Sequence, residues 1–148
     1  MRLKLPSPRD WQLEALESWI ENENKGIVKV VTGGGKTVFS GYCLNEIFKE
    51  KPETNVLVIV PTIVLQDQWY SIIVHSWGVD EADVTTKLEE GFTSKFTILV
   101  VNTASKRDLS IWFDSDSILI VDECHKTASE VFRSIYTHHS SPIFIFHI

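Results

Sequence analysis

Short runs of apolar residues alternate with helical patterns along this chain. The apolar runs occupy residues 27–31, 56–60, 97–101, 118–121 and 143–148. Runs of this length predict strands that are buried on both faces, which are typical of parallel sheets. Between these runs, apolar residues recur at the spacing of helices. The alternation predicts an α/β fold, a three-layer sandwich with a mostly parallel central sheet.

Capping residues suggest where the helices begin. Ser7, followed by Pro8, is expected to cap a first helix whose inward residues are Trp11, Leu13, Leu16, Trp19 and Ile20. Thr62 is expected to cap a helix over residues 63–77, with Trp69 in the core and with Gln66 and Gln68 in solvent. Other helices are expected over residues 38–48, 109–113 and 127–139, and a short strand within residues 79–95.

Length and charge restrict the function classes. With 148 residues, the chain is expected to form one domain, residues 1–148, that buries roughly 68–70% of its unfolded surface. The formal net charge of −6 argues against a strongly basic nucleic-acid surface. Any contact with nucleic acid would have to be local or shared with another chain.

The cysteines and the first residues indicate the compartment. Cys43 and Cys124 provide no disulfide framework, which favours a reducing environment. The opening MRLKLPSPRDW contains no apolar targeting core, and no apolar run approaches the length of a membrane span. We therefore expect an intracellular, cytoplasmic protein without a membrane partner.

A glycine-rich turn, TGGGKT at residues 32–37, follows the first apolar run. Three consecutive glycines let backbone N–H groups face a phosphate, and the helix that follows would direct its positive dipole end at the same anion. Lys36 would reach the phosphates and the Thr37 hydroxyl would ligate Mg²⁺. Val30 stands at the leading glycine of the full pattern. A plain turn is the alternative, but the flanking strand and helix favour a nucleotide-phosphate site.

Two acids, Asp122 and Glu123, follow the apolar run at residues 118–121. The carboxyl ends of parallel strands are where α/β sheets place their ligands. One carboxylate would hold Mg²⁺ and its neighbour would orient or deprotonate an attacking water. A capping cluster is the alternative. A zinc site is not favoured, because no standard ligand spacing is present among Cys124, His125, His138 and His139.

The set of motifs resembles superfamily 2 helicases. TGGGKT and VDECH (residues 121–125) resemble motifs I and II. Arg9-x-x-Gln12, which alone would read as an exposed polar pair, resembles the R-x-x-Q element of XPB-like and type III restriction-subunit helicases. VPTIVLQDQW (residues 60–69) resembles motif Ia, and NTAS (residues 102–105) resembles the next nucleic-acid-contacting segment. The order and spacing agree along the entire chain.

This resemblance implies a P-loop NTPase fold, the first RecA-like lobe, with ATP and Mg²⁺ as cofactors. Gln12 would read adenine, and Asp122 and Thr37 would hold Mg²⁺. Glu123 would activate water, with Lys36 and Asp122 as the other catalytic residues. The nucleotide would be bound by Arg9, Gln12, Thr32, Gly33, Gly34, Gly35, Lys36, Thr37 and His125. The nucleic-acid backbone would be contacted by Pro61, Thr62, Gln68 and Thr103.

The sequence departs from the helicase pattern at its carboxyl end. Members continue into a Ser/Thr-Ala-Thr motif where this chain reads FIFHI at residues 144–148, so an incomplete lobe is expected. Arginine fingers of a second lobe are worth about 10³–10⁵ in rate in related P-loop systems, so we expect weak or no hydrolysis and no unwinding by the chain alone. Ile63 stands where motif Ia often carries arginine. An apolar last strand at a sheet edge would invite self-association.

Three functions stay open on this evidence. The first is the ATP-binding lobe of a helicase that contacts nucleic acid, DNA rather than RNA, and that pairs with a second helicase lobe. The alternative is a non-catalytic nucleotide-binding or protein-interaction module that regulates a partner helicase. A small-molecule P-loop kinase is disfavoured by DECH and by the lack of a basic lid segment after it.

Overall fold

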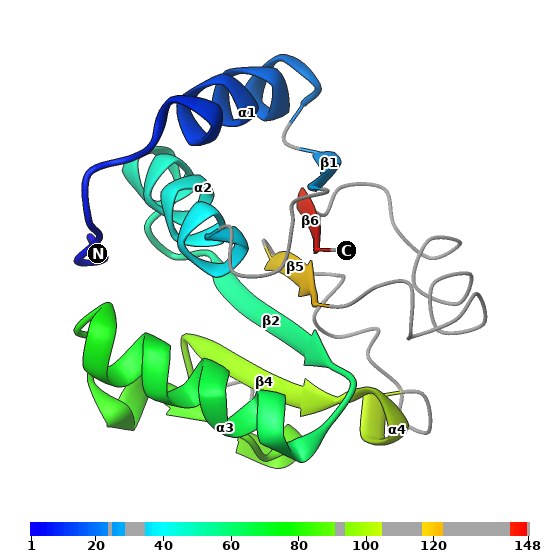
Figure 1. Ribbon diagram of the computed structural model, residues 1–148. Coiled ribbons are helices and arrows are strands. Elements are labelled where there is room, and N and C mark those ends of the chain that lie inside the picture. Colours follow the sequence, from blue (N-terminus) through cyan, green and yellow to red (C-terminus); the bar gives the residue numbers. More distant parts are fainter. Residues whose placement is uncertain (24, 29–34, 91–93, 105–116, 123–142, 148) are drawn as a thin grey trace.

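The strands assemble into one parallel sheet (Figure 1). The computed structural model describes residues 1–23, 25–28, 35–90, 94–104, 117–122 and 143–147. Within these residues the sheet has six strands in the order β1-β6-β5-β2-β4-β3, and each neighbouring pair is parallel. The strands are β1 (Lys25–Val28), β2 (Asn55–Val60), β3 (Val84–Thr85), β4 (Phe96–Val100), β5 (Ser117–Val121) and β6 (Ile143–His147). The predicted α/β class is confirmed.

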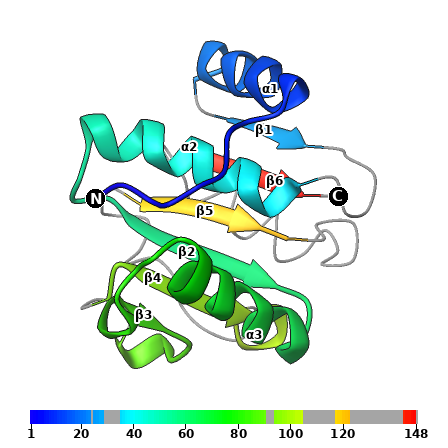
Figure 2. The same ribbon diagram turned by 60° about the vertical axis from the view of Figure 1, so that its left-hand side comes forward.

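Two helices cover one face of this sheet. α2 (Lys36–Glu50) and α3 (Ile63–Ser71) lie on the same side of the strands, and α1 (Asp10–Glu21) lies beside α2 (Figure 2). Alternate strand residues such as Val58, Ile98 and Ile120 join the core with side chains from these helices. The residues between them, such as Leu57, Leu99 and Leu119, are each 1% exposed. Burial of both faces explains why the strands read as continuous apolar runs.

The helix after β2 begins and ends where the sequence predicts. The Leu65 N–H donates to Thr62 Oγ1 over 3.2 Å, so Thr62 caps α3. α3 runs on into a π-helical turn, Ile72–Ser76, and the helical stretch ends before Gly78, whose φ of +76° favours glycine. Shorter elements are α4 (Val101–Ala104) and the 3₁₀ turns Glu81–Asp83 and Leu88–Glu90.

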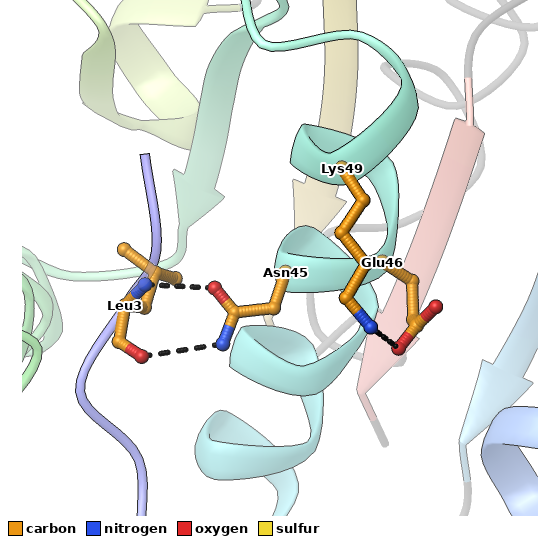
Figure 3. Close-up of polar contacts among 4 residues, drawn as sticks. All are labelled: Leu3, Asn45, Glu46 and Lys49. Carbon is orange, nitrogen blue, oxygen red and sulfur yellow. Dashed lines mark hydrogen bonds and ion pairs between the residues drawn. The ribbon is translucent and has the colours of Figure 1, made fainter.

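The amino-terminal segment is held against α2 before α1 begins. The Leu3 N–H donates to Asn45 Oδ1 (2.7 Å) and Asn45 Nδ2 donates to the Leu3 carbonyl (3.2 Å) (Figure 3). The Asn45 amide thus satisfies both backbone hydrogen-bonding groups of Leu3. The Lys4 N–H also donates to the Trp77 carbonyl (3.0 Å), beyond α3. The segment thereby links α2 to the end of the α3 stretch. The exposed Lys49–Glu46 ion pair beside it (2.8 Å, Figure 3) contributes little to stability.

The predicted start of the first helix is wrong by two residues. Arg9, with an extended backbone, is the N-cap of α1, and its N–H donates to Gln12 Oε1 over 2.8 Å. The glutamine three residues after the cap therefore satisfies the cap N–H, and the predicted Ser7 cap is not used. Leu13 and Ile20 were expected inside but are 46% and 47% exposed. Among the described residues, α1 packs mainly on α2 and on β1, so these two elements cover only part of its apolar stripe.

β6 lies inside the sheet. It pairs with β1 on one side and with β5 on the other, so the condition for self-association, a free edge on this strand, does not hold. Among the strands that the structure describes, the outer ones are β1 and the two-residue β3. The helices expected over residues 109–113 and 127–139 lie outside the described residues.

Candidate functional site

The last glycine of the glycine-rich turn contacts the R-x-x-Q element directly. Gln12 is 3% exposed, and its Nε2 donates to the Gly35 carbonyl over 3.2 Å while its Oε1 accepts from Arg9. Gly35 has φ of +86°, and a Cβ built there would lie 2.9 Å from Gln12 Nε2. The left-handed backbone favours glycine here, and a Cβ would displace the Gln12 amide from its present position. The two motifs, 23 residues apart, therefore form one structural unit.

The candidate phosphate ligands stand on the first turn of α2. Gly35 is the N-cap of this 15-residue helix, and Lys36 and Thr37 are its first residues, both half-buried. The N-terminal end of α2 lies near the carboxyl ends of the strands β1, β5 and β6 (Figure 2). At this position the helix dipole and the backbone N–H groups of the first turn favour an anion. Trp11 of α1 packs on Phe39 with ring centroids 5.9 Å apart, which holds α1 against this turn.

Asp122 directly follows β5, at the same carboxyl-terminal end of the strands. It is 7% exposed, its N–H donates to the Ile59 carbonyl (3.0 Å), and its Oδ2 accepts from Trp69 Nε1 of α3 over 2.8 Å in a buried hydrogen bond. A buried carboxylate is tolerated only when it is hydrogen-bonded, and a bond to a charged acceptor contributes about 1.5–3 kcal/mol. Trp69 thus joins the motif Ia helix to the candidate Mg²⁺ ligand.

The predicted nucleic-acid residues follow two paired strands. Val60 of β2 is in register with Val100 of β4, so Pro61 and Thr62 on one side and Thr103 in α4 on the other leave the sheet together. Thr62, Gln68 and Thr103 are exposed, and Pro61 is half-buried. Ile63 and Val64, at the start of α3, are each 66% exposed. Of the two, Ile63 stands at the position where the motif Ia pattern often has arginine.

Several predicted site residues lie outside the described residues: Thr32, Gly33, Gly34, Glu123 and His125. Their roles stay predictions, as do the roles predicted for the site residues that the structure describes. The described part of the chain holds no group of three or more His, Cys, Asp or Glu side chains that could bind a metal. The residues named for zinc all fall outside that part.

Burial raises the pKa of the Cys43 thiol well above its usual value, so this thiol stays protonated.

Two contacts at the site were missed in the sequence. Trp69 was expected to be a core residue, and it is 1% exposed, but its indole N–H also bonds Asp122. Gln66 was expected in solvent, yet its Nε2 donates to the Ile98 carbonyl of β4 over 2.9 Å. Both residues lie within the motif Ia stretch, and this was the only sign in the sequence that they could belong to a site. Their hydrogen-bond partners could not be predicted, because these depend on how α3 lies on the sheet.

Solved structures share this fold. The UvsW helicase of bacteriophage T4 superposes with a TM-score of 0.78 at 19% identity, over 99% of this chain and 55% of that one. The helicase MrfA, solved bound to DNA and AMPPNP, superposes with a TM-score of 0.70 at 15% identity, over 99% of this chain and 27% of that one. The parallel α/β sheet, with a helix after the glycine-rich motif and an acid after β5, has the fold of a RecA-like helicase lobe.

Residues 5–147 match the family described as Type III restriction enzyme, res subunit, and the chain belongs to this family. A protein assigned as helicase 22 of Sulfolobus islandicus filamentous virus is 25% identical over 153 residues, which cover 91% of this chain and 26% of the viral protein. The chain spans about a quarter or less of the length of the curated relatives that it matches. In the described residues, no helix is long and apolar enough to cross a membrane.

Proposed function

We propose that this chain binds Mg·ATP and contacts the sugar–phosphate backbone of nucleic acid, as the ATP-binding lobe of a helicase. The observation that carries the proposal is the unit formed by Gln12, Gly35 and the first turn of α2, with the buried Asp122 at the same edge of the sheet. This arrangement lies in a chain that belongs to a helicase-type family. The relatives are longer proteins, so ATP binding and nucleic-acid contact by this chain are proposed and not inferred directly from them.

The donor set suits a nucleotide with a divalent cation. Lys36 and the N–H groups of the α2 terminus would bind phosphate oxygens. The Thr37 hydroxyl and the Asp122 carboxylate are hard oxygen ligands, which Mg²⁺ prefers, and it retains water and phosphate oxygens as its other ligands. When bound, the cation would neutralise charge on the phosphates. Gln12 would hold the turn and face the base, and Glu123 would orient the attacking water.

The nucleic-acid contact would be made at the carboxyl ends of β2 and β4. Thr62 and Thr103 present hydroxyl groups there, and phosphate contacts of this kind do not depend on base sequence. MrfA was solved with DNA, which supports DNA as the first partner to test. With a net charge of −6, binding is expected to be weak and sensitive to salt.

Mg·ATP binding by the 148-residue chain, with Lys36→Ala as its counterpart, tests the proposal. We expect saturable binding of a fluorescent ATP analogue with Mg²⁺, and a loss of about ten-fold or more in affinity for Lys36→Ala, because a charge-assisted contact to phosphate is removed. Lys51→Ala, which removes an exposed lysine just after α2, is the matched control and should bind as the unmodified chain does. Absence of binding at millimolar nucleotide would contradict the proposal.

Turnover and DNA dependence separate the alternatives. The polypeptide tested alone is expected to hydrolyse ATP slowly, because the arginine fingers that the resemblance assigns to a second lobe are not among its residues. DNA-stimulated hydrolysis would favour the helicase lobe. Intact nucleotide binding without any DNA effect would favour the regulatory module, and phosphoryl transfer to a metabolite in a substrate screen would favour a kinase.

A further inference from the structure

One buried polar contact joins the motif Ia helix to the candidate Mg²⁺ ligand. We propose that Trp69 is a positioning residue for the metal site: its indole N–H holds the Asp122 carboxylate in the orientation that binds Mg²⁺. This inference rests on the proposed function, because it takes Asp122 to be a metal ligand. Trp69 itself touches neither metal nor nucleotide in this role.

The contact is short, buried and remote in sequence. Trp69 Nε1 lies 2.8 Å from Asp122 Oδ2, and the two residues are 53 positions apart in the sequence. Trp69 is 1% exposed and Asp122 is 7% exposed. An indole has a single donor and no acceptor, so its one N–H must point at an acceptor when the ring is buried. A carboxylate, by contrast, accepts at about four positions, and one bond to Oδ2 is compatible with a metal ligand role.

The direction of the indole N–H is set by packing. Trp69 meets Trp77 edge to face, with centroids 6.1 Å apart and planes at 87°. Trp77 in turn packs on Phe96 of β4 (6.5 Å, 57°), and Phe96 packs edge to face on Phe48 of α2 (6.4 Å, 83°). This row of four aromatic rings locks the Trp69 ring between α3, the sheet and α2. A ring that cannot rotate holds its N–H in one direction. A group that orients a metal ligand through a hydrogen bond needs such a fixed direction.

A second bond fixes the helix that carries Trp69. Gln66 Nε2, one turn earlier, donates to the Ile98 carbonyl of β4 over 2.9 Å. α3 is therefore attached to the sheet at two side chains, one on the β4 backbone and one on Asp122. Because Asp122 is also tied through its own N–H to Ile59 of β2 (3.0 Å), both its backbone and its side chain are oriented. The carboxylate is held before any metal binds.

The experiment measures how much Mg²⁺ the site needs. The full chain and Trp69→Phe are titrated with Mg²⁺ at a fixed concentration of a fluorescent ATP analogue, and nucleotide binding is also measured in EDTA. We expect Trp69→Phe to raise the half-saturating Mg²⁺ concentration about ten-fold or more, the range seen when partners of metal ligands are removed, with EDTA-state binding unchanged. Trp19→Phe is the matched control, since Trp19 is also a buried core tryptophan (4% exposed) but lies on α1.

The outcomes are distinct. An equal rise for Trp19→Phe, or no rise for Trp69→Phe, would overturn the positioning role, because the effect would then come from the loss of a core tryptophan in general or would not exist. If Trp69→Phe does not fold, 3-benzothienylalanine at position 69 keeps the ring shape and replaces only the N–H; an unchanged Mg²⁺ requirement in that protein would overturn the inference. If the unmodified chain binds no Mg·ATP, the proposed function itself fails. If the unmodified chain binds Mg·ATP normally, a negative result for the Trp69 variants counts against the positioning role alone.

Discussion

The two candidate binding regions of this molecule are built in opposite ways. At the nucleotide side, Gln12 and Asp122 are buried and each is hydrogen-bonded to a distant part of the chain. At the nucleic-acid side, Thr62, Thr103 and their neighbours are exposed, and their arrangement comes from the register of β2 with β4. The first region is held by side chains and the second by the sheet.

This difference has a physical reason. A site for a compact, highly charged ligand needs its donors fixed before binding, and buried hydrogen bonds in a medium of low dielectric constant fix them well. A strand of nucleic acid is long and contacts many points weakly, so exposed hydroxyl groups on a rigid edge are sufficient. Substitutions should therefore affect fold and binding together at the nucleotide side. On the other side, exposed positions such as Ile63 should affect binding alone, whereas Thr62 also caps α3.

The largest effect is expected from Gly35→Ala. An alanine would take a left-handed backbone (φ +86°) and its Cβ would approach Gln12 Nε2 to 2.9 Å. We expect a loss of about 2–3 kcal/mol in the free energy of unfolding, from backbone strain and the displaced glutamine, together with weaker Mg·ATP binding. Chemical denaturation and nucleotide titration measure the two quantities.

Gly78→Ala is the matched control for the backbone term. Gly78 also has a positive φ (+76°), but a Cβ there would meet only the flexible Lys4 side chain, at 3.1 Å. We expect a stability loss of about 1–2 kcal/mol from the backbone term and no change in nucleotide binding. If both alanine variants bind Mg·ATP equally well, Gly35 has no special relation to the nucleotide site.

An intermediate effect is expected from Gln12→Ala. The change removes the bonds to the Arg9 N–H and the Gly35 carbonyl and leaves a small cavity, so we expect a loss of about 1–2 kcal/mol in the free energy of unfolding. The exposed Gln68→Ala should stay within about 0.5 kcal/mol. Equal stability of the two variants in urea denaturation would show that the Gln12 bonds do not hold α1 to the turn.

The smallest effect on the fold is expected from Ile63→Arg. Ile63 is 66% exposed, so stability should change by no more than about 0.5 kcal/mol. A new cation at the end of β2 should instead strengthen binding to single- or double-stranded DNA and steepen its salt dependence by about one unit of slope. Fluorescence anisotropy over a salt series measures this. Ile20→Arg, at an isoleucine of α1 that is 47% exposed, is the control; an equal gain there would mean that charge alone, not position, is responsible.

Much of the fold was predictable because its signals are local. The strands β2, β4, β5 and β6 lie within one or two residues of the apolar runs that predict them, and Thr62 caps α3 as predicted. The start of α1 was not, because Ser7 and Arg9 are both acceptable before a helix and the choice depends on Gln12 reaching back to the Arg9 N–H. Leu13 and Ile20 were misplaced for a related reason: periodicity shows which face is apolar, but the neighbouring elements decide how much of it is covered.

The sequence by itself determined the alternation of strands and helices, the motif order and the residue types suited to phosphate and Mg²⁺, since these depend on neighbours a few positions apart. Tertiary structure alone decided that β6 lies between β1 and β5, that Gln12 meets Gly35 and that Trp69 holds Asp122. The two side-chain contacts join residues 23 and 53 positions apart, and the pairing of β1 with β6 brings Lys25 beside Phe144. They depend on the strand order and on how each helix lies on the sheet, and the packing of the whole core determines both.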